Sequence, residues 1–513
     1  MDPARIEALR DPAIYPERAD SVEILQTHLS VVVLSGDRAY KFKKAIRLPF
    51  ADFTSLEKRR HFCREELRLN RRLCPEIYEE VVDLCVNEGG YRIGGAGNLI
   101  DHAVRMRRLP QDRMMDVLLE RDEVTMAQVE SIARRVVAFH RGALRGPEID
   151  EWGDPEKLRD LALANFSESR DHFPGRLHSI LAARTRADFE RLLPDLRRRL
   201  AAGLVVDGHG DLHVRNICLV DPPAIYDCIE FNPGFRCADV ATEHAFLVMD
   251  LRFRGHTELA RRYLATVLAE SGDGELSGVL PALVRYRAMV RAKVSALQAR
   301  EPEVPEADRT AADLEARRYL RFVAATSVEE EGPLWLIFCG LPASGKSSVA
   351  EALHGASGKA WPVFSSDRIR KELAGVAPSE QLSEFFYSEE FSDRTYRALL
   401  ERSSAATGEH RVVILDANFR ERRERFLARE AARAAGARIA ILRVDAGEEV
   451  VIQRLASRKN DPNSVSDAGR EVYEKLKARY ERPREDEADK LIAVDGDLEP
   501  TVAVEGILAA LLE

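Results

Sequence analysis

One eight-residue segment, Gly340-Leu341-Pro342-Ala343-Ser344-Gly345-Lys346-Ser347, constrains the fold of this chain more than any other. It follows an apolar run, 335–339, and precedes a helical pattern that begins at Ser348. Glycines let a backbone curl around phosphate without a Cβ in the way, and the N–H groups of the loop and of the helix N-terminus then point at anionic oxygens. The segment therefore predicts a P-loop, in which these eight residues and Ser348 contact a nucleoside triphosphate.

The last two residues of the segment have separate predicted roles. Lys346 is expected to reach the β- and γ-phosphates of ATP, and the hydroxyl of Ser347 to bind Mg²⁺. A glycine-rich turn without a ligand is the alternative. The position of the segment between an apolar run and a helical pattern disfavours that alternative.

Beyond the P-loop the chain alternates helical patterns with apolar runs. The runs 412–415 and 439–442 are typical of buried strands. Such alternation predicts a parallel sheet covered by helices on both faces. The acidic segment 327–333 (SVEEEGP) is the best candidate for a linker before this part of the chain.

Charged residues at the ends of these patterns resemble the sites of small P-loop kinases, namely the gluconate-kinase, polynucleotide-kinase-like and zeta-toxin families. The resemblance implies that Asp367 orients or deprotonates the acceptor hydroxyl, which agrees with the need of phosphoryl transfer for a nearby proton acceptor. Asp416 ends a strand as a Walker B segment does and is expected to hold Mg²⁺ or to contact the acceptor. Arg454 and Arg458, four residues apart on one helix face, correspond to the lid that closes over the transferring phosphate.

Each of these three assignments has a plainer alternative. Asp367 could cap a helix that begins near Ile369. Asp416 could be an ordinary residue at the end of a strand. Arg454 and Arg458 could form a solvated basic helix face.

The N-terminal half contains a second motif, His209-Gly210-Asp211-Leu212-His213-Val214-Arg215-Asn216, with the spacing H-x-D-L-x-x-x-N. This spacing predicts that Asp211 accepts the proton of an acceptor hydroxyl and that Asn216 binds Mg²⁺. Asp227 follows eleven residues later, at the end of a short apolar run, and is expected to be the second Mg²⁺ ligand. The motif resembles the aminoglycoside-phosphotransferase and choline-kinase-like branch of the kinase fold, which phosphorylates small-molecule hydroxyls.

The residues before this motif fit the N-lobe of such a fold. A hairpin is predicted over 31–44, and its Lys41 resembles the lysine that holds the α- and β-phosphates; Lys43 is the rival on the same strand face. Glu66, on a helix predicted over 55–73, resembles the glutamate that pairs with this lysine, and Glu65 is its rival. No G-x-G-x-x-G loop precedes the lysine, so the segment 27–30 is expected to cover the phosphates instead.

Length and composition set outer limits. A chain of 513 residues predicts two or three domains. Seven scattered cysteines argue against a disulfide framework or a zinc site and predict buried, reduced thiols. No apolar run approaches 18 residues and the charged N-terminus is no signal peptide, so a location in the cytoplasm without membrane contact is expected.

Taken together, the two motifs resemble bacterial fusion proteins described as bifunctional aminoglycoside phosphotransferase-like/ATP-binding proteins. The resemblance implies two domains: an N-terminal α+β protein-kinase-like fold over 1–328, with an N-lobe of about 1–108 and a C-lobe of about 109–328, and a C-terminal α/β P-loop NTPase domain over 333–513. The word aminoglycoside describes kinship of fold here and names no substrate.

These features predict an ATP- and Mg²⁺-dependent kinase with two sites. Each site would transfer the γ-phosphoryl group to a hydroxyl of a small molecule such as a sugar or an aminocyclitol. One alternative is a single active P-loop kinase gated by a regulatory kinase-like domain, and another is a polynucleotide 5′-hydroxyl kinase. The net charge of −9 and the lack of aromatic-rich basic stretches count against a nucleic-acid partner. No short motif specifies the acceptor or the oligomeric state.

Overall fold

The computed structural model describes residues 3–17, 19–27, 29–48, 51–302, 304–377, 379–458 and 469–513. The chain divides into two compact units. Unit 1 comprises Met1–Leu161, Phe189–Leu251 and Glu258–Val284, and unit 2 comprises Ala162–Asp188, Arg252–Thr257 and Arg285–Glu513. The divisions fall inside helices α6 (Pro155–Ser169), α7 (Arg176–Ala201), α9 (Val240–Phe253), α10 (Thr257–Ser271) and α11 (Leu276–Gln298).

Unit 1 contains a six-stranded antiparallel sheet in the order β1-β2-β3-β8-β6-β7. The strands are β1 (Val22–Gln26), β2 (Ser30–Ser35), β3 (Arg38–Lys43), β6 (Tyr78–Asn87), β7 (Gly90–Ile93) and β8 (Asn98–Arg107). Strands β2 and β3 form the predicted hairpin, with Val32 opposite Lys41. The prediction of a hairpin over 31–44 is therefore confirmed.

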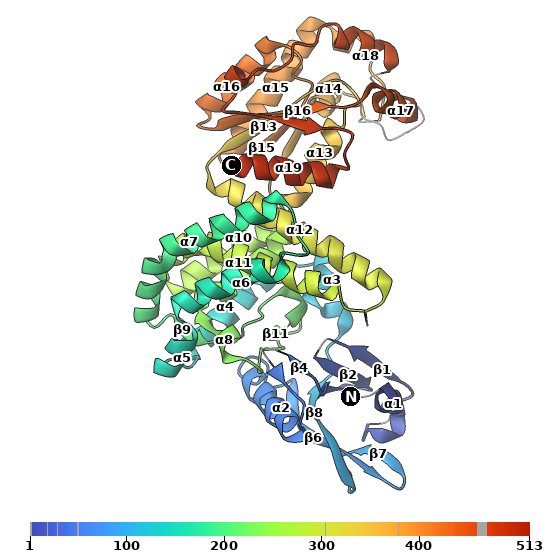
Figure 1. Cartoon of the computed structure of the whole chain (residues 1–513), viewed down its shortest axis with the longest axis vertical. Coiled ribbons are helices and arrows are strands. Elements are labelled where there is room, and N and C mark those ends of the chain that lie inside the picture. The colour runs from blue at the N-terminus through green and yellow to red at the C-terminus, as the bar shows by residue number, and fades with distance from the viewer. Residues whose placement is uncertain are drawn as a thin grey trace. The chain divides into compact units, whose positions relative to one another are not determined.

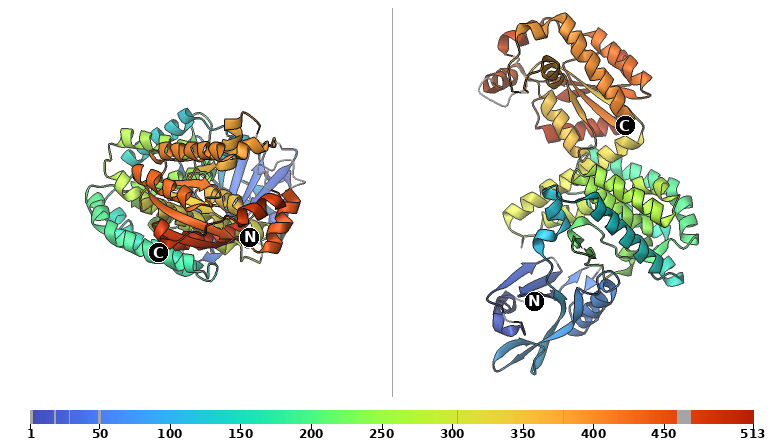
Figure 2. Two further views of the ribbon diagram at one scale, coloured as in Figure 1. Left: turned by 90° about the horizontal axis from the view of Figure 1, so that it is seen from above. Right: turned by 180° about the vertical axis from the view of Figure 1, so that it is seen from behind.

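The alternation of side chains along β3 decides which residues face the site. Tyr40 and Phe42 are fully buried in a cluster with Leu9 on one face of the sheet. Because neighbouring side chains of a strand point to opposite faces, Lys41 and Lys43 share the other face. Helix α2 (Leu56–Asn70) covers that face; it follows the N-cap Ser55, close to the predicted start, and ends before the predicted end at residue 73 (Figures 1 and 2).

The rest of unit 1 is mainly helical and carries short strands that hold the second motif. Helices include α3 (Met115–Glu120), α4 (Met126–Gly142), α5 (Pro147–Trp152), α8 (Pro233–Arg236) and α10 (Thr257–Ser271). Strand β9 (Val205–Asp207) pairs with β12 (Cys237–Asp239), and β10 (Ile217–Cys218) pairs with β11 (Ala224–Ile225). A sheet lobe with one covering helix and a helical lobe that carries the H-x-D-L-x-x-x-N loop form the predicted α+β kinase-like fold.

Unit 2 contains a parallel five-stranded sheet in the order β14-β15-β13-β16-β17. The strands are β13 (Leu334–Cys339), β14 (Val363–Ser365), β15 (Val412–Asp416), β16 (Arg438–Asp445) and β17 (Lys490–Asp495). Helices α13 (Lys346–Ala356) and α19 (Pro500–Leu512) lie on one face, and α15 (Glu389–Thr407) and α16 (Arg422–Ala434) lie on the other (Figure 1). The predicted α/β P-loop architecture is confirmed.

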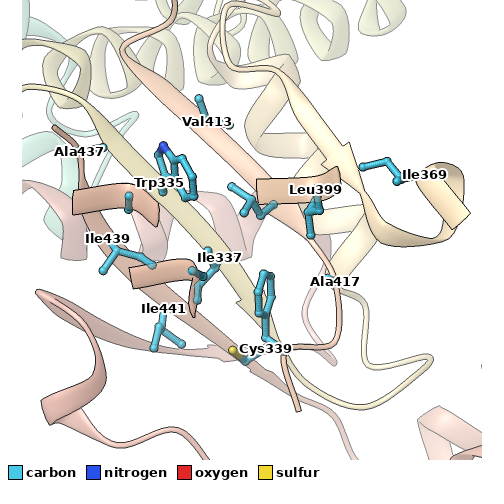
Figure 3. Packing of buried hydrophobic residues seen from close by; sticks show 14 residues of the cluster. Trp335, Ile337, Cys339, Ile369, Leu399, Val413, Ala417, Ala437, Ile439 and Ile441 are labelled. Atoms are coloured by element: carbon cyan, nitrogen blue, oxygen red, sulfur yellow. The ribbon is translucent and has the colours of Figure 1, made fainter. Parts of the chain in front are cut away.

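The central strand β13 anchors the start of the P-loop in the apolar core. All six of its residues are buried. Trp335, Ile337 and Cys339 pack with Leu399 of α15 and with neighbouring strands in one apolar cluster (Figure 3). A strand buried on both faces is an unbroken apolar run, which is why the sequence pattern predicted it correctly.

The prediction of a linker over 327–333 is wrong for its first four residues, because helix α12 (Glu306–Glu330) continues through them. Val328 is 1% exposed. The acidic run is not solvated as its composition suggested: Glu329 pairs with Arg252 at 2.6 Å and Glu330 with Arg285 at 2.8 Å. Ion pairs within unit 2 thus stabilise this acidic segment as part of a helix, although its composition is typical of a linker.

Two compositional predictions can be compared with the structure. All seven cysteines are buried and free, as predicted. Across the described ranges, no helix combines the length and the apolar character needed to cross a bilayer.

Candidate functional site

The P-loop of unit 2 has the backbone of an anion-binding nest. Gly340, Ala343 and Gly345 all have positive φ angles, of 152°, 62° and 101°. A Cβ on residue 340 would lie 2.4 Å from the carbonyl oxygen of Val444, so only glycine fits there. Turns of this kind direct successive N–H groups to one point, where they bind phosphate oxygens.

Two side chains of the loop fit a triphosphate. Lys346 is the first residue of α13, and its ammonium donates to the carbonyl oxygen of Leu341 at 2.7 Å, so it lies folded over the loop. The hydroxyl of Ser344 is buried and has no hydrogen-bond partner among the described residues. A buried donor without a partner is costly in free energy, and a phosphate oxygen in the loop would satisfy it.

Ser347 and Asp416 form the part of the site that fits Mg²⁺. Asp416 ends β15, which is paired with β13, and its carboxylate is hydrogen-bonded by the Ser347 hydroxyl. Burial raises the pKa of Asp416, with a further rise from Asp367, while Ser347 and Lys346 oppose it. A hydroxyl and a carboxylate oxygen at the edge of a sheet match the hard oxygen ligands that Mg²⁺ prefers.

Asp367 lies in the first turn of α14 (Ser366–Ala374), directly after β14. The N-cap of this helix is Ser365, so Asp367 does not occupy the capping position that was its plainer alternative. Its charge acts on Asp416, which ends the neighbouring strand. Asp367 and Asp416 therefore belong to the same edge of the sheet as the P-loop.

Arg454 bonds the P-loop itself. Its guanidinium, on α17 (Glu448–Arg458), donates to the carbonyl oxygens of Gly496 at 2.9 Å and of Ala343 at 3.4 Å. This contact does not fit the alternative of a purely solvated helix face. Arg458 is the last residue of α17, and its side chain lies outside the described residues.

A cavity of about 440 Å³ adjoins the P-loop. Its lining comes from the loop and α13 (Gly345, Ser348, Val349), from α17 (Gln453, Arg454) and from the segment after β17 (Leu498). A volume of this size and a mixed apolar and polar lining are typical of small-molecule sites. Ser348, which follows the P-loop, is one of the lining residues of this cavity.

In unit 1, the loop after β9 brings Asp211 and Asn216 together. The Asn216 amide donates to the Asp211 carboxylate at 3.1 Å and to its backbone oxygen at 3.0 Å. Asn216 is buried, whereas the Asp211 side chain is 33% exposed. His213 lies 3.3 Å from the same carboxylate. The predicted proton acceptor is therefore held in place and still accessible.

Asp227 completes this group of residues from the loop after β11. It has a φ angle of 64°, which is rare for a residue with a Cβ. Its backbone N–H donates to the Tyr78 hydroxyl at 3.3 Å, and its carboxylate, with a side chain 43% exposed, is bonded by Lys41. Asp227 lies two residues beyond the strand that was expected to end on it.

The two candidate lysines, Lys41 and Lys43, have different ion-pair partners. Lys41 pairs with Glu66 at 2.8 Å and with Asp227, whereas Lys43 pairs with Glu66 and with Glu230. Burial opposes the charge on Lys41, but the surrounding carboxylates outweigh it and raise its pKa well above the ordinary value. Both lysines are therefore charged.

The choice between Glu65 and Glu66 is clear from geometry. Glu66 is fully buried and faces both lysines, while Glu65 pairs with Arg68 on the outer side of α2. Thr27 and Ser30 close the turn between β1 and β2: the Thr27 N–H donates to the Ser30 carbonyl oxygen at 2.9 Å, and the Ser30 N–H donates to the Thr27 hydroxyl at 3.0 Å. His28, in the segment expected to cover the phosphates, lies outside the described residues.

Sequence reasoning missed Glu243 of α9, which anchors the loop that carries Asp211. Its buried carboxylate accepts hydrogen bonds from the backbone N–H groups of His209 and Gly210, the latter at 2.8 Å, and lies 2.7 Å from the imidazole of His140. No fixed spacing connects this residue to the loop. The available signal was an acidic residue within the apolar pattern of 240–253, since such residues are buried only when paired.

His209 has a defined tautomer in this network. Burial lowers its pKa, so the ring is neutral. Its Nδ1 accepts from the N–H of Asp211 at 3.3 Å, and its Nε2 donates to the carbonyl oxygen of Tyr226 at 3.0 Å. The histidine thus ties the Asp211 loop to the segment that leads to Asp227.

Neither site is a closed metal cage. Among the described residues, no group of three His, Cys, Asp or Glu side chains is arranged to hold a metal ion. Mg²⁺ is usually held by one or two protein oxygens together with phosphate oxygens and water. The pairs Asn216/Asp227 and Ser347/Asp416 fit that mode of binding.

Two comparisons with known sequences match this chain. A family model described as AAA domain matches residues 336–483, which include the P-loop and Asp416. The uncharacterized protein Rv2004c of Mycobacterium tuberculosis (strain ATCC 25618 / H37Rv) is 30% identical over 467 residues, 89% of this chain and 90% of the relative. Both predicted parts of the chain therefore lie within one alignment.

Two solved structures are also similar to parts of the chain. Amicoumacin kinase hAmiN in complex with AMP-PNP, Ca²⁺ and Ami is 12% identical, with a TM-score of 0.39, covering 63% of this chain and 96% of that one. A gluconokinase from Sinorhizobium meliloti 1021 is 24% identical, with a TM-score of 0.26, covering 35% of this chain and 91% of that one. The roles of the site residues have to come from the geometry described above.

Proposed function

This chain belongs to the family of the uncharacterized protein Rv2004c of Mycobacterium tuberculosis, and we propose that it is an ATP-dependent kinase with two phosphotransferase sites. One site contains Asp211 and the other contains the P-loop. The observation that carries the proposal is common to both: a carboxylate lies beside residues that fit a nucleotide and Mg²⁺. Each site would transfer the γ-phosphoryl group to the hydroxyl of a small molecule.

At the C-terminal site each residue has a task that its position allows. The P-loop N–H groups and Lys346 hold the phosphates, and Ser347 with Asp416 holds Mg²⁺, which neutralises the charge of the transferring group. Asp367, at the same edge of the sheet, accepts the proton of the acceptor hydroxyl. The cavity beside Ser348 takes the nucleoside.

At the N-terminal site Asp211 accepts the proton of the acceptor hydroxyl. Asn216, which bonds the same carboxylate, and Asp227 hold Mg²⁺. Lys41, paired with Glu66, turns from Asp227 to the α- and β-phosphates when the nucleotide binds.

The two sites belong to two functional domains in this proposal. The kinase-like domain covers 1–328, with its N-lobe over about 1–108 and its C-lobe over about 109–328, and the P-loop domain covers 333–513. In support, the strands of the six-stranded antiparallel sheet all lie between Val22 and Arg107, and the P-loop strand begins at Leu334. ATP and Mg²⁺ are the cofactors, and the acceptors are small hydroxyl compounds.

A binding experiment tests the number of sites without knowledge of the acceptor. Titration of the full chain with AMP-PNP and Mg²⁺ should show two bound nucleotides in the wild type and one in either Lys346→Ala or Lys41→Met. The double variant should bind none. Lys58→Met, which removes an exposed lysine of α2, is the matched control and should still bind two.

The outcomes separate the two sites. A wild type that binds one nucleotide, lost in Lys346→Ala alone, would leave a single P-loop kinase with a kinase-like domain that does not bind ATP. Binding that survives in Lys346→Ala at both sites would refute the P-loop assignment.

A further inference from the structure

A buried cluster of charges joins the sheet lobe of the kinase-like fold to the loop that carries Asp227. Its ammonium groups are Lys41 and Lys43, both on β3. Its carboxylates come from three places: Glu66 on α2, Asp227 after β11, and Glu230 three residues further on. Only Lys41, Glu66 and Asp227 have a role in the site as proposed above.

Lys43 cannot take the place of Lys41 at a nucleotide. Its side chain is 2% exposed, and its carboxylate partners Glu66 and Glu230 are 0% and 5% exposed. Lys41 lies at the accessible edge of the cluster, because its partner Asp227 is 43% exposed. The two lysines therefore divide into an outer group that can reach a ligand and an inner group that cannot.

The inner lysine, Lys43, compensates part of the negative charge of the buried carboxylates. Removing one partner of a buried ion pair is strongly destabilising, because it leaves the other charge buried and unpaired. If Lys41 turned toward phosphate oxygens, Glu66 would still be neutralised by Lys43. The inner lysine thus keeps a cationic partner beside Glu66 while the outer lysine exchanges partners.

The same inner pair holds the loop of Asp227. The loop is tied to the sheet lobe at Asp227, whose N–H bonds Tyr78, and at Cys228, whose N–H donates to the Asn70 side chain at 2.9 Å. Glu230 adds the third tie through Lys43. Since Asp227 has a left-handed backbone, its conformation depends on such neighbouring contacts.

We propose that Lys43 and Glu230 are positioning residues for the N-terminal site: their ion pair holds the Asp227 loop against the sheet and keeps Glu66 neutralised while Lys41 contacts the nucleotide. The inference rests on the proposed function of this site. It assigns to Glu230 a role in Mg²⁺ affinity although Glu230 is too deeply buried to be a ligand.

The test uses the full chain with Lys346→Ala, so that AMP-PNP binding reports on the N-terminal site alone. The apparent affinity for Mg²⁺ in the presence of AMP-PNP should fall about tenfold or more in Glu230→Gln and further in Lys43→Met, in line with other residues that position metal ligands. The double variant should bind better than Lys43→Met alone, because only Glu66, and not Glu230 as well, then lacks the lysine partner. Lys43→Arg should restore part of the affinity.

The matched control is another buried ion pair of the same lobe. Arg59 of α2 and Asp101 of β8 lie 2.7 Å apart, both buried, and neither bonds the Asp227 loop. Arg59→Met should lower the melting temperature and leave the Mg²⁺ affinity of the parent unchanged. If Lys43→Met does not fold, the near-isosteric Glu230→Gln carries the test.

Two results would overturn this inference and leave the proposed function of the N-terminal site intact. One is an unchanged Mg²⁺ affinity in Glu230→Gln and Lys43→Met, and the other is an equal loss in Arg59→Met, which would mean that any buried pair of the lobe matters. A parent that binds no nucleotide would instead refute the N-terminal site and, with it, this inference.

Discussion

Replacement of Glu243 by glutamine should loosen the loop that carries Asp211. The carboxylate accepts hydrogen bonds from the backbone N–H groups of His209 and Gly210 and lies 2.7 Å from His140. The substitution keeps the shape of the side chain and removes its charge. The side chain at position 243 has no room to shift toward Gly208, because its carboxylate packs so closely there that a Cβ on residue 208 would lie only 2.2 Å from it.

The pKa of Glu243 sets the size of the effect. Burial raises this pKa, but the contacts with His140, His209 and Gly210 outweigh burial and lower it from 4.5 to about 2. Since one pKa unit corresponds to about 1.4 kcal/mol, the ionised state of Glu243 stabilises the folded loop by about 3 kcal/mol at neutral pH. That is a large share of the stability of a typical domain.

The sign of the pH dependence follows from the direction of the shift. A carboxyl group whose pKa is lower in the folded state contributes stability above its unfolded pKa and loses it as the pH falls through the folded value. The wild type should therefore be more stable than Glu243→Gln at pH 7, and the difference should shrink below about pH 4.5. Hydrogen exchange of the His209 and Gly210 amides measures this locally, without assuming that the whole chain unfolds in one step.

An equal difference at pH 7 and at pH 3 would refute the reasoning, because it would mean that shape and not charge holds the loop. Unchanged exchange in the variant would refute the anchoring role altogether. Glu130→Gln is the control for loss of a carboxylate: it lies on α4, and its ion pairs with Arg134 and Arg262 are at the surface. Surface pairs contribute about 0–1 kcal/mol.

Three further predictions concern the chemistry of the two sites. Asp211→Asn should lower turnover at the N-terminal site by about 10²–10⁴-fold with nucleotide binding retained, measured as transfer from labelled ATP to an identified acceptor. Asp367→Asn should do the same at the C-terminal site alone, and loss at both sites would contradict two independent centres. Gly340→Ala should lower the free energy of unfolding by about 1–3 kcal/mol and abolish nucleotide binding at the P-loop, because the new Cβ would lie 2.4 Å from the Val444 carbonyl oxygen. Gly355→Ala, with open space around it, is the control and should retain binding in the same titration.

The motifs that could be predicted are those in which one short stretch of chain performs the whole task. The P-loop binds phosphate with its own backbone, so its glycines and the apolar strand before it appear side by side in the sequence. The loop with Asp211 and Asn216 is equally local, since five residues separate two groups that bond each other. Strand β13 was predictable because burial on both faces makes its pattern unbroken.

Prediction from the sequence failed where the ion-pair partner of a charged residue is distant in the chain. The acidic segment 327–333 suggested a linker, but its first four residues belong to α12, where Glu329 and Glu330 pair with Arg252 and Arg285, far away in sequence. Alternation along a strand placed Lys41 and Lys43 on one face, and no local rule could say which of them reaches a ligand. That choice depends on Asp227 and Glu230, more than 180 residues further along.

The sequence by itself thus determined the P-loop and the Asp211 loop, because their geometry is encoded by residues within a few positions of one another. Only the tertiary structure decided which lysine is the outer one, that Glu66 and not Glu65 faces it, and that Glu230 and Glu243 support the site. A buried charge is tolerated only when an opposite charge or a hydrogen bond meets it in space. The partner can come from any part of the chain, so folding must bring the two together before the role of either can be recognised.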